Sequence, residues 1–300
     1  MSVVLFDPPP SQDDFDEDDV RGMNVGRRQL KTEWPTALYA PEAADKNWRV
    51  ILPFPNTYKN AFLSMCSVDA YPHPTRGGRL CLFLNGTEGD AEAPPEVVDW
   101  IKLVGKPVVM KDNLALSFAL DYEREGGSPT LPQTRIGALR AQAKPYGASA
   151  ATRQTKPAAD ELVSLCVEFL NQMTCYESAD CIVAMPPSDP AKNYNLPRYL
   201  AEHISAVWGR ENLTPSVRTV KARSSIKAVA LADKFDTLAG TIEVDDNVFE
   251  GKRVLLLDDL YQSGISMNYC GLLLLRAGAR KVFGLACEKT CRNDDNVGRG

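Results

Sequence analysis

Two adjacent carboxylates, Asp258 and Asp259, stand directly after the apolar run of residues 254–257. Carboxylates repel phosphate, but they accept strong hydrogen bonds from neutral hydroxyl groups, such as the vicinal hydroxyls of a ribose. An acidic pair at the end of an apolar run therefore predicts a site that holds a sugar through its hydroxyls.

The segment after the acidic pair is suited to a phosphate group. Gly264 lets the backbone come close to a ligand, and Ser263 and Ser266 supply hydroxyl groups. A helix that begins near residue 265 would direct amide groups and the positive end of its dipole toward the same ligand. The predicted 5-phosphate loop consists of Leu260, Tyr261, Gln262, Ser263, Gly264, Ile265 and Ser266. A sugar site followed at once by such a loop predicts that the bound group is a ribose 5-phosphate.

Two other interpretations fit the same run. An apolar strand that ends in acids is also typical of the Walker B strand of a P-loop ATPase, which needs the motif G-x-x-x-x-G-K-[ST] elsewhere. The chain lacks that motif, because the Gly-Lys pairs at 105–106 and 251–252 are followed by Pro107 and Arg253. The remaining alternative is a polar strand end with a helix cap and no ligand.

The segments around the acidic pair predict an α/β fold. Three apolar runs lack the alternation of a half-buried strand and are separated by segments of helical spacing, which indicates a parallel sheet covered on both faces. The predicted strands are 181–185, 254–257 and 281–287, and the predicted helices are 157–173, 196–208 and about 265–277. Ligands of such sheets bind beyond the carboxyl ends of the strands, which is where the acidic pair stands.

The N-terminal part of the chain has a different character. Residues 1–33 contain crowded acids and prolines and predict a disordered lead. Residues 34–130 predict a small β-rich module, because they contain short apolar or alternating runs at 48–54, 79–86, 107–112 and 114–123. The turn-rich stretch 123–135 marks the expected boundary, so that residues 131–300 form the second domain. A weaker alternative makes the module a docking site for a protein partner, with the second domain as its scaffold.

Composition and charge argue against several classes of protein. The 300 residues carry a net charge of −5, so no basic balance indicates nucleic acid as the main partner. No apolar run approaches the roughly 18 residues that span a bilayer, and the N-terminus does not resemble a signal peptide, which indicates the cytoplasm. The eight scattered cysteines form no C-x-x-C pair and the chain has two histidines, which argues against a disulfide framework and against a zinc site of ordinary spacing.

The segment VLLLDDLYQSGIS, residues 254–266, resembles the phosphoribosyl pyrophosphate motif of type I phosphoribosyltransferases. The wider chain is most similar to their ComF-like branch, over RIGALRAQAKPYG (135–147), CIVAMPPSDPAKNYNLPRYLAEHIS (181–205), SSIKAVALADKFDTLAGTIEV (224–244) and LRAGARKVFGLACEKT (275–290). This resemblance implies a parallel-sheet type I phosphoribosyltransferase fold over about residues 131–300, with the β-rich module N-terminal to it. It also implies transfer of a 5-phosphoribosyl group from phosphoribosyl pyrophosphate to a nitrogen nucleophile, with release of pyrophosphate.

The resemblance assigns roles by position. Asp258 and Asp259 hold the ribose hydroxyls, and a magnesium ion is expected with the pyrophosphate, with the same two carboxylates as candidate ligands. The pyrophosphate loop is Pro187, Ser188 and Asp189. Without the family, these three residues read as a proline-rich turn after a strand. Residues 223–240 match the hood segment of that fold, where Lys227 reaches the leaving pyrophosphate or is a solvated lysine.

Gln262 departs from the pattern of the purine-specific members, which carry an acidic general base at this place. Glutamine cannot take up a proton, and base catalysis typically contributes about 10²- to 10⁴-fold, so another acceptor class or a weak enzyme is expected. A second hypothesis is therefore a regulatory module that binds phosphoribosyl pyrophosphate or a nucleoside 5-monophosphate without turnover. The leucine run 272–275 is either core or the interface of a homodimer, and core is the commoner use of such a run.

Overall fold

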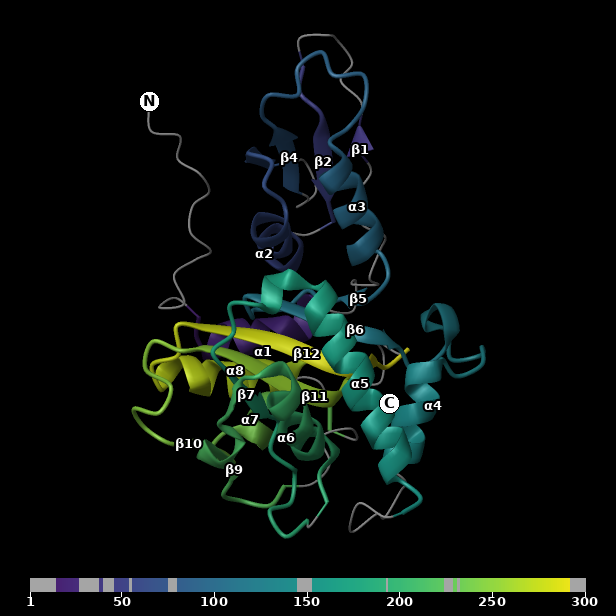
Figure 1. The fold of residues 1–300 in the computed structure, drawn as a ribbon. Coiled ribbons are helices and arrows are strands. Elements are labelled where there is room, and N and C mark those ends of the chain that lie inside the picture. The colour runs from purple at the N-terminus through teal and green to yellow at the C-terminus, as the bar shows by residue number, and fades with distance from the viewer. Residues whose placement is uncertain are drawn as a thin grey trace.

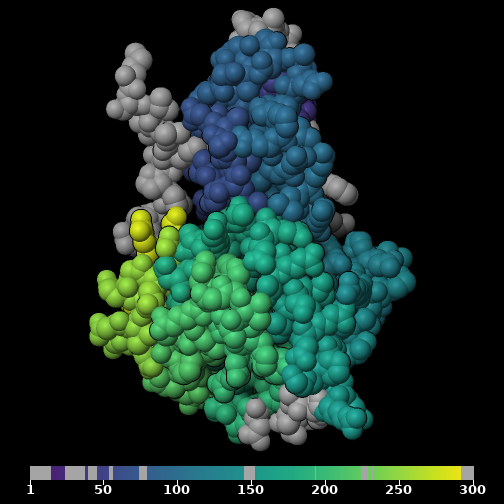
Figure 2. All heavy atoms as spheres, viewed as in Figure 1, coloured from purple at the N-terminus to yellow at the C-terminus, as the bar shows by residue number. Residues whose placement is uncertain are grey.

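The computed structural model forms three sheets in the part of the chain that it describes, and helices flank the largest of them. It describes residues 15–26, 38–39, 46–53, 56–74, 80–144, 153–192, 194–223, 229–230 and 233–291. In Figure 1 and Figure 2 the elements from β1 (Leu38–Tyr39) to α3 (Pro95–Val104) form a narrower lobe that stands on a larger body, and the N-terminal helix α1 (Glu17–Gly26) lies in that body.

A six-stranded sheet organises the larger body. In spatial order, its strands are β5 (Val108–Val109), β6 (Leu116–Tyr122), β12 (Lys281–Lys289), β11 (Arg253–Tyr261), β7 (Cys181–Ala184) and β8 (Glu211–Asn212). Neighbouring strands from β6 to β8 are parallel, whereas β5 runs antiparallel to β6. The chain is thus an α/β protein with a mixed, mostly parallel sheet, in agreement with the coarse prediction from its sequence.

Helices cover both faces of this sheet because successive strand residues point to opposite sides. Along β11, Leu255 and Leu257 join the apolar core under α4 (Arg135–Ala143), α5 (Lys156–Gln172) and α6 (Leu196–Trp208). Val254 and Leu256 join a second core under α8 (Ile265–Arg276) and the short α7 (Lys234–Leu238). The helices predicted at 157–173, 196–208 and 265–277 are therefore confirmed, with ends that differ by one residue at most.

The chain between β8 and β11 forms a separate two-stranded antiparallel sheet. It pairs β9 (Val217–Thr219) with β10 (Ile242–Val244), on either side of the predicted hood segment. Of that segment, residues 224–228 and 231–232 lie outside the described residues, and with them lies Lys227.

The leucine run of α8 belongs to the core. Leu272 and Leu274 are fully buried, and Leu273 and Leu275 pack against the same core from partly buried positions. None of the helices in the described ranges combines the length and the apolar character needed to cross a bilayer.

The smaller lobe is built on a four-stranded antiparallel sheet, as the β-rich prediction required. Its strands, in spatial order, are β1 (Leu38–Tyr39), β2 (Arg49–Leu52), β4 (Leu80–Leu84) and β3 (Ala70–Pro74). Two helices that the sequence reading omitted, α2 (Asn56–Met65) and α3 (Pro95–Val104), share its core, where Phe62 meets Trp100 edge to face at 5.2 Å. The buried positions Val97, Trp100 and Val104 repeat at helical spacing, a signal that was present in the sequence.

The boundary between the two parts lies earlier than residue 130. Strands β5 and β6, which the sequence reading gave to the N-terminal module, belong to the six-stranded sheet. Residues 116–119 are buried on both faces, the property of an inner strand of a parallel sheet. Thr57 in α2 also donates a hydrogen bond of 2.8 Å to the Met110 carbonyl. A fragment cut at 130 would therefore remove two strands from the larger sheet.

The prediction of a disordered lead is wrong for residues 17–26, which form helix α1 (Glu17–Gly26). Asp16 caps this helix: its Oδ1 accepts from the Asp19 amide at 3.1 Å, and its own amide donates to Asp19 Oδ2 at 3.0 Å. The acidic cluster therefore acts as a capping box. Val20 and Met23 are buried in the contact of α1 with α8. Residues 1–14 and 27–33 lie outside the described part of the chain.

Candidate functional site

The acidic pair lies inside β11 and not after it. Pairing with β12 continues to Tyr261, whereas pairing with β7 stops at Leu257. The placement of Leu260 and Tyr261 in the phosphate loop is therefore wrong: they are strand residues, held by a neighbour that sequence pattern alone does not reveal. The loop between β11 and α8 consists of residues 262–264, and Gly264 ends it with a φ of +76°, a conformation that favours glycine.

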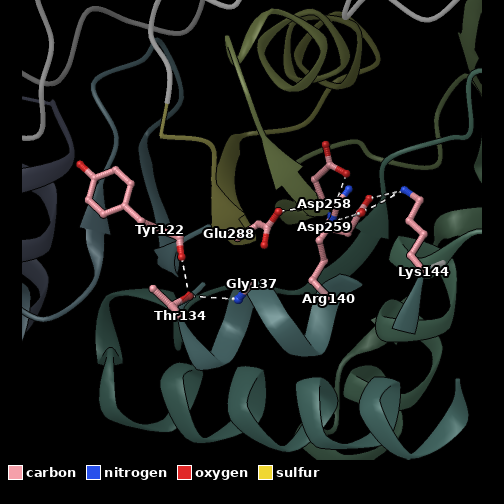
Figure 3. Close-up of polar contacts among 8 residues, drawn as sticks. All are labelled: Tyr122, Thr134, Gly137, Arg140, Lys144, Asp258, Asp259 and Glu288. Atoms are coloured by element: carbon pink, nitrogen blue, oxygen red, sulfur yellow. Dashed lines mark hydrogen bonds and ion pairs between the residues drawn. The ribbon is translucent and has the colours of Figure 1, made fainter. Parts of the chain in front are cut away.

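Because strand residues alternate, Asp258 and Asp259 point to opposite faces of the sheet. Figure 3 shows the Asp259 carboxylate directed toward Lys144, while the Asp258 carboxylate points away from α4. The structure therefore places the two predicted sugar ligands side by side in the chain but in different surroundings.

Asp259 is the centre of a buried ion-pair network. Its Oδ2 lies 2.9 Å from Nε of Arg140, and its Oδ1 lies 2.7 Å from Nζ of Lys144. Arg140 also reaches Oε1 of Glu288, at the end of β12, at 3.3 Å. Burial acts to raise the pKa of Asp259, but the two cations outweigh it and hold the pKa at about 2. Asp259 is thus an ionised carboxylate whose two oxygens are both engaged by α4.

Helix α4 is held close to the end of β6, which fixes its two cations. Thr134 caps the helix, since its hydroxyl oxygen accepts from the Gly137 amide at 3.0 Å and donates to the Tyr122 carbonyl at 2.6 Å (Figure 3). A Cβ at Gly137 would lie 2.2 Å from the Glu123 carbonyl oxygen, so only glycine permits this approach. Arg140 and Lys144 were not predicted as site residues, although both lie in the segment 135–147 that resembles the ComF-like branch.

Asp258 is half-buried on the α8 face of the sheet. Its Oδ1 accepts a hydrogen bond of 2.8 Å from the Asp259 amide. Burial, followed by the negative charge of Asp259, raises the pKa of Asp258 to about 7. This carboxyl group therefore differs from its neighbour in exposure, in partners and in the pH range in which it ionises.

Arg223 places a cation near Asp258 that sequence reasoning did not single out. Nε and Nη1 of its guanidinium are buried, and no group in the described ranges accepts a hydrogen bond from either atom. Burial lowers the pKa of Arg223, and the negative charge of Asp258 opposes that shift. Buried donors without acceptors are rare in native proteins and call for an explanation such as a bound anion.

The predicted pyrophosphate loop lies beside this cation. It follows β7, the strand next to β11, and the Met185 amide donates to the Leu257 carbonyl at 2.8 Å. The Ser188 carbonyl accepts from the Arg223 amide at 3.0 Å, and the Pro187 carbonyl accepts from the Thr219 hydroxyl. Residues 187–189 are half-buried. Pro187, Ser188 and Asp189 therefore follow the strand that neighbours β11, and their role stays a prediction.

The predicted 5-phosphate loop is only partly open to a ligand. Ser263 is 6% exposed, and Gly264 and Ile265 are also buried, whereas Gln262 and Ser266 are half-buried. The Ser263 hydroxyl is thus shielded in this conformation. The groups that remain suited to a phosphate are the Ser266 hydroxyl and the amides of the first turn of α8, which have no partner within the helix.

The acidic pair does not fit a resident magnesium site. Both oxygens of Asp259 are engaged by cations. In the residues that the structure describes, no three His, Cys, Asp or Glu side chains are grouped to hold a metal ion. Magnesium together with a bound pyrophosphate stays a prediction.

The sequence was compared with models of known protein families and with curated proteins, and nothing in either set matches it.

Proposed function

We propose that the carboxyl ends of β7 and β11 bind phosphoribosyl pyrophosphate, and that the chain transfers its 5-phosphoribosyl group to a nitrogen nucleophile. The observation that carries this proposal is Arg223, a half-buried residue whose guanidinium atoms Nε and Nη1 are buried without a described acceptor. The negative charge of Asp258 acts on this guanidinium, and the Arg223 amide donates to the predicted pyrophosphate loop. A diphosphate would supply the acceptors that these donors need. The resemblance of residues 131–300 to the ComF-like branch of type I phosphoribosyltransferases supports the same ligand.

Each part of the ligand meets a different group in this arrangement. Asp258 accepts hydrogen bonds from the ribose hydroxyls, and the Ser266 hydroxyl with the first amides of α8 receives the 5-phosphate. Arg223 and residues 187–189 hold the pyrophosphate. Asp259 keeps its two ion pairs and holds α4, so its proposed role changes from sugar ligand to support of the strand end.

In the proposed reaction, the nitrogen of the acceptor forms a bond to C1 of the ribose. The bond from C1 to the pyrophosphate oxygen breaks, and its electron pair leaves with pyrophosphate. Positive charge develops on the sugar ring as that bond lengthens, and Asp258 places negative charge at the sugar end of the site while Arg223 stabilises the leaving group. The acceptor proton passes to solvent, because Gln262 cannot take it up.

Binding tests the proposal first. Calorimetric titration of the full chain with phosphoribosyl pyrophosphate and magnesium should give saturable heat, and Asp258→Asn should weaken the affinity about tenfold or more. Asp180→Asn is the matched control, because Asp180 contacts Arg253 at the opposite end of the same strand. Equal affinity in wild type and Asp258→Asn would overturn the proposal, as would wild-type protein that binds no phosphoribosyl pyrophosphate.

A second candidate is binding without turnover, as in a regulatory module. Gln262 favours it, because the loop has no acidic residue at the place of the general base. Release of pyrophosphate from the same titrated protein, measured across a panel of nucleobases and amines, separates the two candidates. Release with one acceptor supports the transferase, and tight binding with no release from any acceptor supports the regulatory module.

A further inference from the structure

A buried polar network lies behind the loop that joins β11 to α8. Asp112, in the connection between β5 and β6, is 3% exposed, and its Oδ1 accepts from the Ser117 hydroxyl at 2.9 Å. The other oxygen, Oδ2, accepts from the Tyr261 hydroxyl at 3.0 Å. Nδ2 of the fully buried Asn268 lies 3.5 Å from the same oxygen. One carboxylate is therefore shared between the sheet and the two elements that flank the loop.

The network reaches the loop from both of its ends. Tyr261 is the last residue of β11, and Asn268 lies in the first turn of α8. Nδ2 of Asn268 donates to the Gly264 carbonyl at 2.9 Å, and its Oδ1 accepts from the Asn113 amide at 2.9 Å. The loop residues 262–264 are thus tied, before and after, to the same short connection at 112–113.

The same connection extends to the N-terminal helix. Nδ2 of Asn113 donates to the Asp19 carbonyl at 2.9 Å. Helix α1 packs on α8, and Arg276 of α8 pairs with Glu17 at 2.9 Å. The conformation of the loop therefore depends on residues more than 100 positions earlier in the chain, and not only on its own sequence.

Burying such a network costs free energy, but a network in which each donor has an acceptor restricts its side chains to one arrangement. A buried carboxylate is tolerated when donors surround it, and each donor then has a defined direction. Moving Tyr261 or Asn268 would separate a buried donor from its acceptor, so the network restricts the position of the amides at the start of α8.

We infer that Asp112 is a positioning residue that fixes the spacing of the 5-phosphate-binding amides by holding Tyr261 and Asn268. The inference rests on the proposed function, because it assigns a purpose to the loop that the network holds. It gives the connection between β5 and β6 a part in ligand binding, although none of its residues touches the ligand.

The test compares the wild-type chain with the Tyr261→Phe variant, the Asp112→Asn variant and the double variant. Tyr176→Phe is the matched control: this fully buried tyrosine also loses one hydroxyl, which donates to the Gly284 carbonyl at 2.7 Å in β12. Each variant is titrated with phosphoribosyl pyrophosphate and magnesium, and separately with inorganic phosphate, and its melting temperature is recorded.

Each single variant should weaken binding of both ligands about tenfold, and the double variant should be no weaker than the weaker single variant, because the hydrogen bond from Tyr261 to Asp112 is absent from all three. Tyr176→Phe should melt at a lower temperature and bind both ligands like the wild type. Unchanged affinity in Tyr261→Phe, with a melting temperature lowered as in Tyr176→Phe, would limit the network to stability and overturn the inference alone. Wild-type protein that binds neither ligand would overturn the proposed function together with it. If Asp112→Asn does not fold, Tyr261→Phe decides.

Discussion

Arginine and aspartate side chains lie at both ends of β11, but the two groups differ in exposure and in partners. At the amino end, Arg253 and Asp180 form a two-point ion pair, with Nη2 to Oδ1 at 2.7 Å and Nε to Oδ2 at 3.0 Å. Both side chains are 37% exposed. At the carboxyl end, Asp259 is 4% exposed and contacts two cations, while the half-buried Arg223 has two buried donors, Nε and Nη1, without described acceptors.

This difference separates charges that water stabilises from charges that the fold must stabilise. Exposed pairs contribute little to stability and are easily exchanged. Buried charges lose their hydration, and the loss is tolerated when exact partners replace the water or when a site needs the charge. The carboxyl end shows both conditions, complete pairing at Asp259 and incomplete pairing at Arg223, and four substitutions test that distinction.

The largest effect on stability is expected for Asp259→Asn. The change removes a charged partner of Arg140, whose side chain is only 19% exposed. The free energy of unfolding should therefore fall by about 3–5 kcal/mol. Urea denaturation at pH 7 measures this value. A loss below about 1 kcal/mol would mean that the network contributes no more than a surface pair.

Arg223→Gln should produce the reverse pattern, with little change in stability and a large change in binding. Because the buried Nε and Nη1 of Arg223 have no described acceptor, their removal should leave the melting temperature unchanged or raise it, while affinity for phosphoribosyl pyrophosphate falls about tenfold or more. Arg218→Gln is the control, since Arg218 is 49% exposed and pairs with Glu243 on the neighbouring strand. Equal affinity of both variants would remove Arg223 from the site.

Asp258 should make ligand binding depend on pH near neutrality. Its pKa is raised to about 7 by burial and by the charge of Asp259, and only the ionised form accepts hydrogen bonds at both oxygens. Wild-type affinity should therefore rise between pH 6 and pH 8, and titrations of Asp258→Asn should keep only the pH dependence that belongs to the ligand. Parallel pH profiles of the two proteins would contradict the assignment.

The same shift has a consequence for stability with a defined sign. Between the ordinary pKa of a carboxyl group and the raised value, the folded chain retains a proton that the unfolded chain has released. Stability therefore falls as pH rises through that window, and Asp258→Asn should flatten this part of the pH profile.

The smallest effect is expected for Asp180→Asn at the amino end of the strand. The Arg253 guanidinium holds the pKa of Asp180 at about 2, but both groups are more than one third exposed, so solvent screens the pair. The free energy of unfolding should change by about 1 kcal/mol or less, with no change in ligand affinity. A loss of unfolding free energy as large as that of Asp259→Asn would contradict the difference between the two ends of β11.

Local signals in the sequence were sufficient for helices α5, α6 and α8, whereas α1, α2 and α3 were not predicted. Helix α6 has its predicted ends because Asn195 caps it, accepting from the Arg198 amide at 2.8 Å, and Gly209 ends it with a φ of +70°. The length of β11 was not predictable in this way, because its last residues are held in the strand by pairing with β12.

The partners of the acidic pair required the tertiary structure. Arg140 and Lys144 lie 119 and 115 positions before Asp259 in the chain, and Asp112 lies 149 positions before Tyr261. Whether a carboxylate faces water, a cation or a neighbouring strand depends on such distant contacts. The motif therefore identified the two acidic residues. The different surroundings of Asp258 and Asp259 follow from strand alternation and from the elements that pack on each face of the sheet.

The contact between Gly137 and the Glu123 carbonyl bears on how the molecule would change shape around a ligand. Helix α4 has no room to slide inward along the sheet, and its two cations are already committed to Asp259. On that face of the sheet, α4 is therefore held in place. Any rearrangement that brought α4 closer to the end of β6 would therefore have to break the contact between Gly137 and the Glu123 carbonyl first.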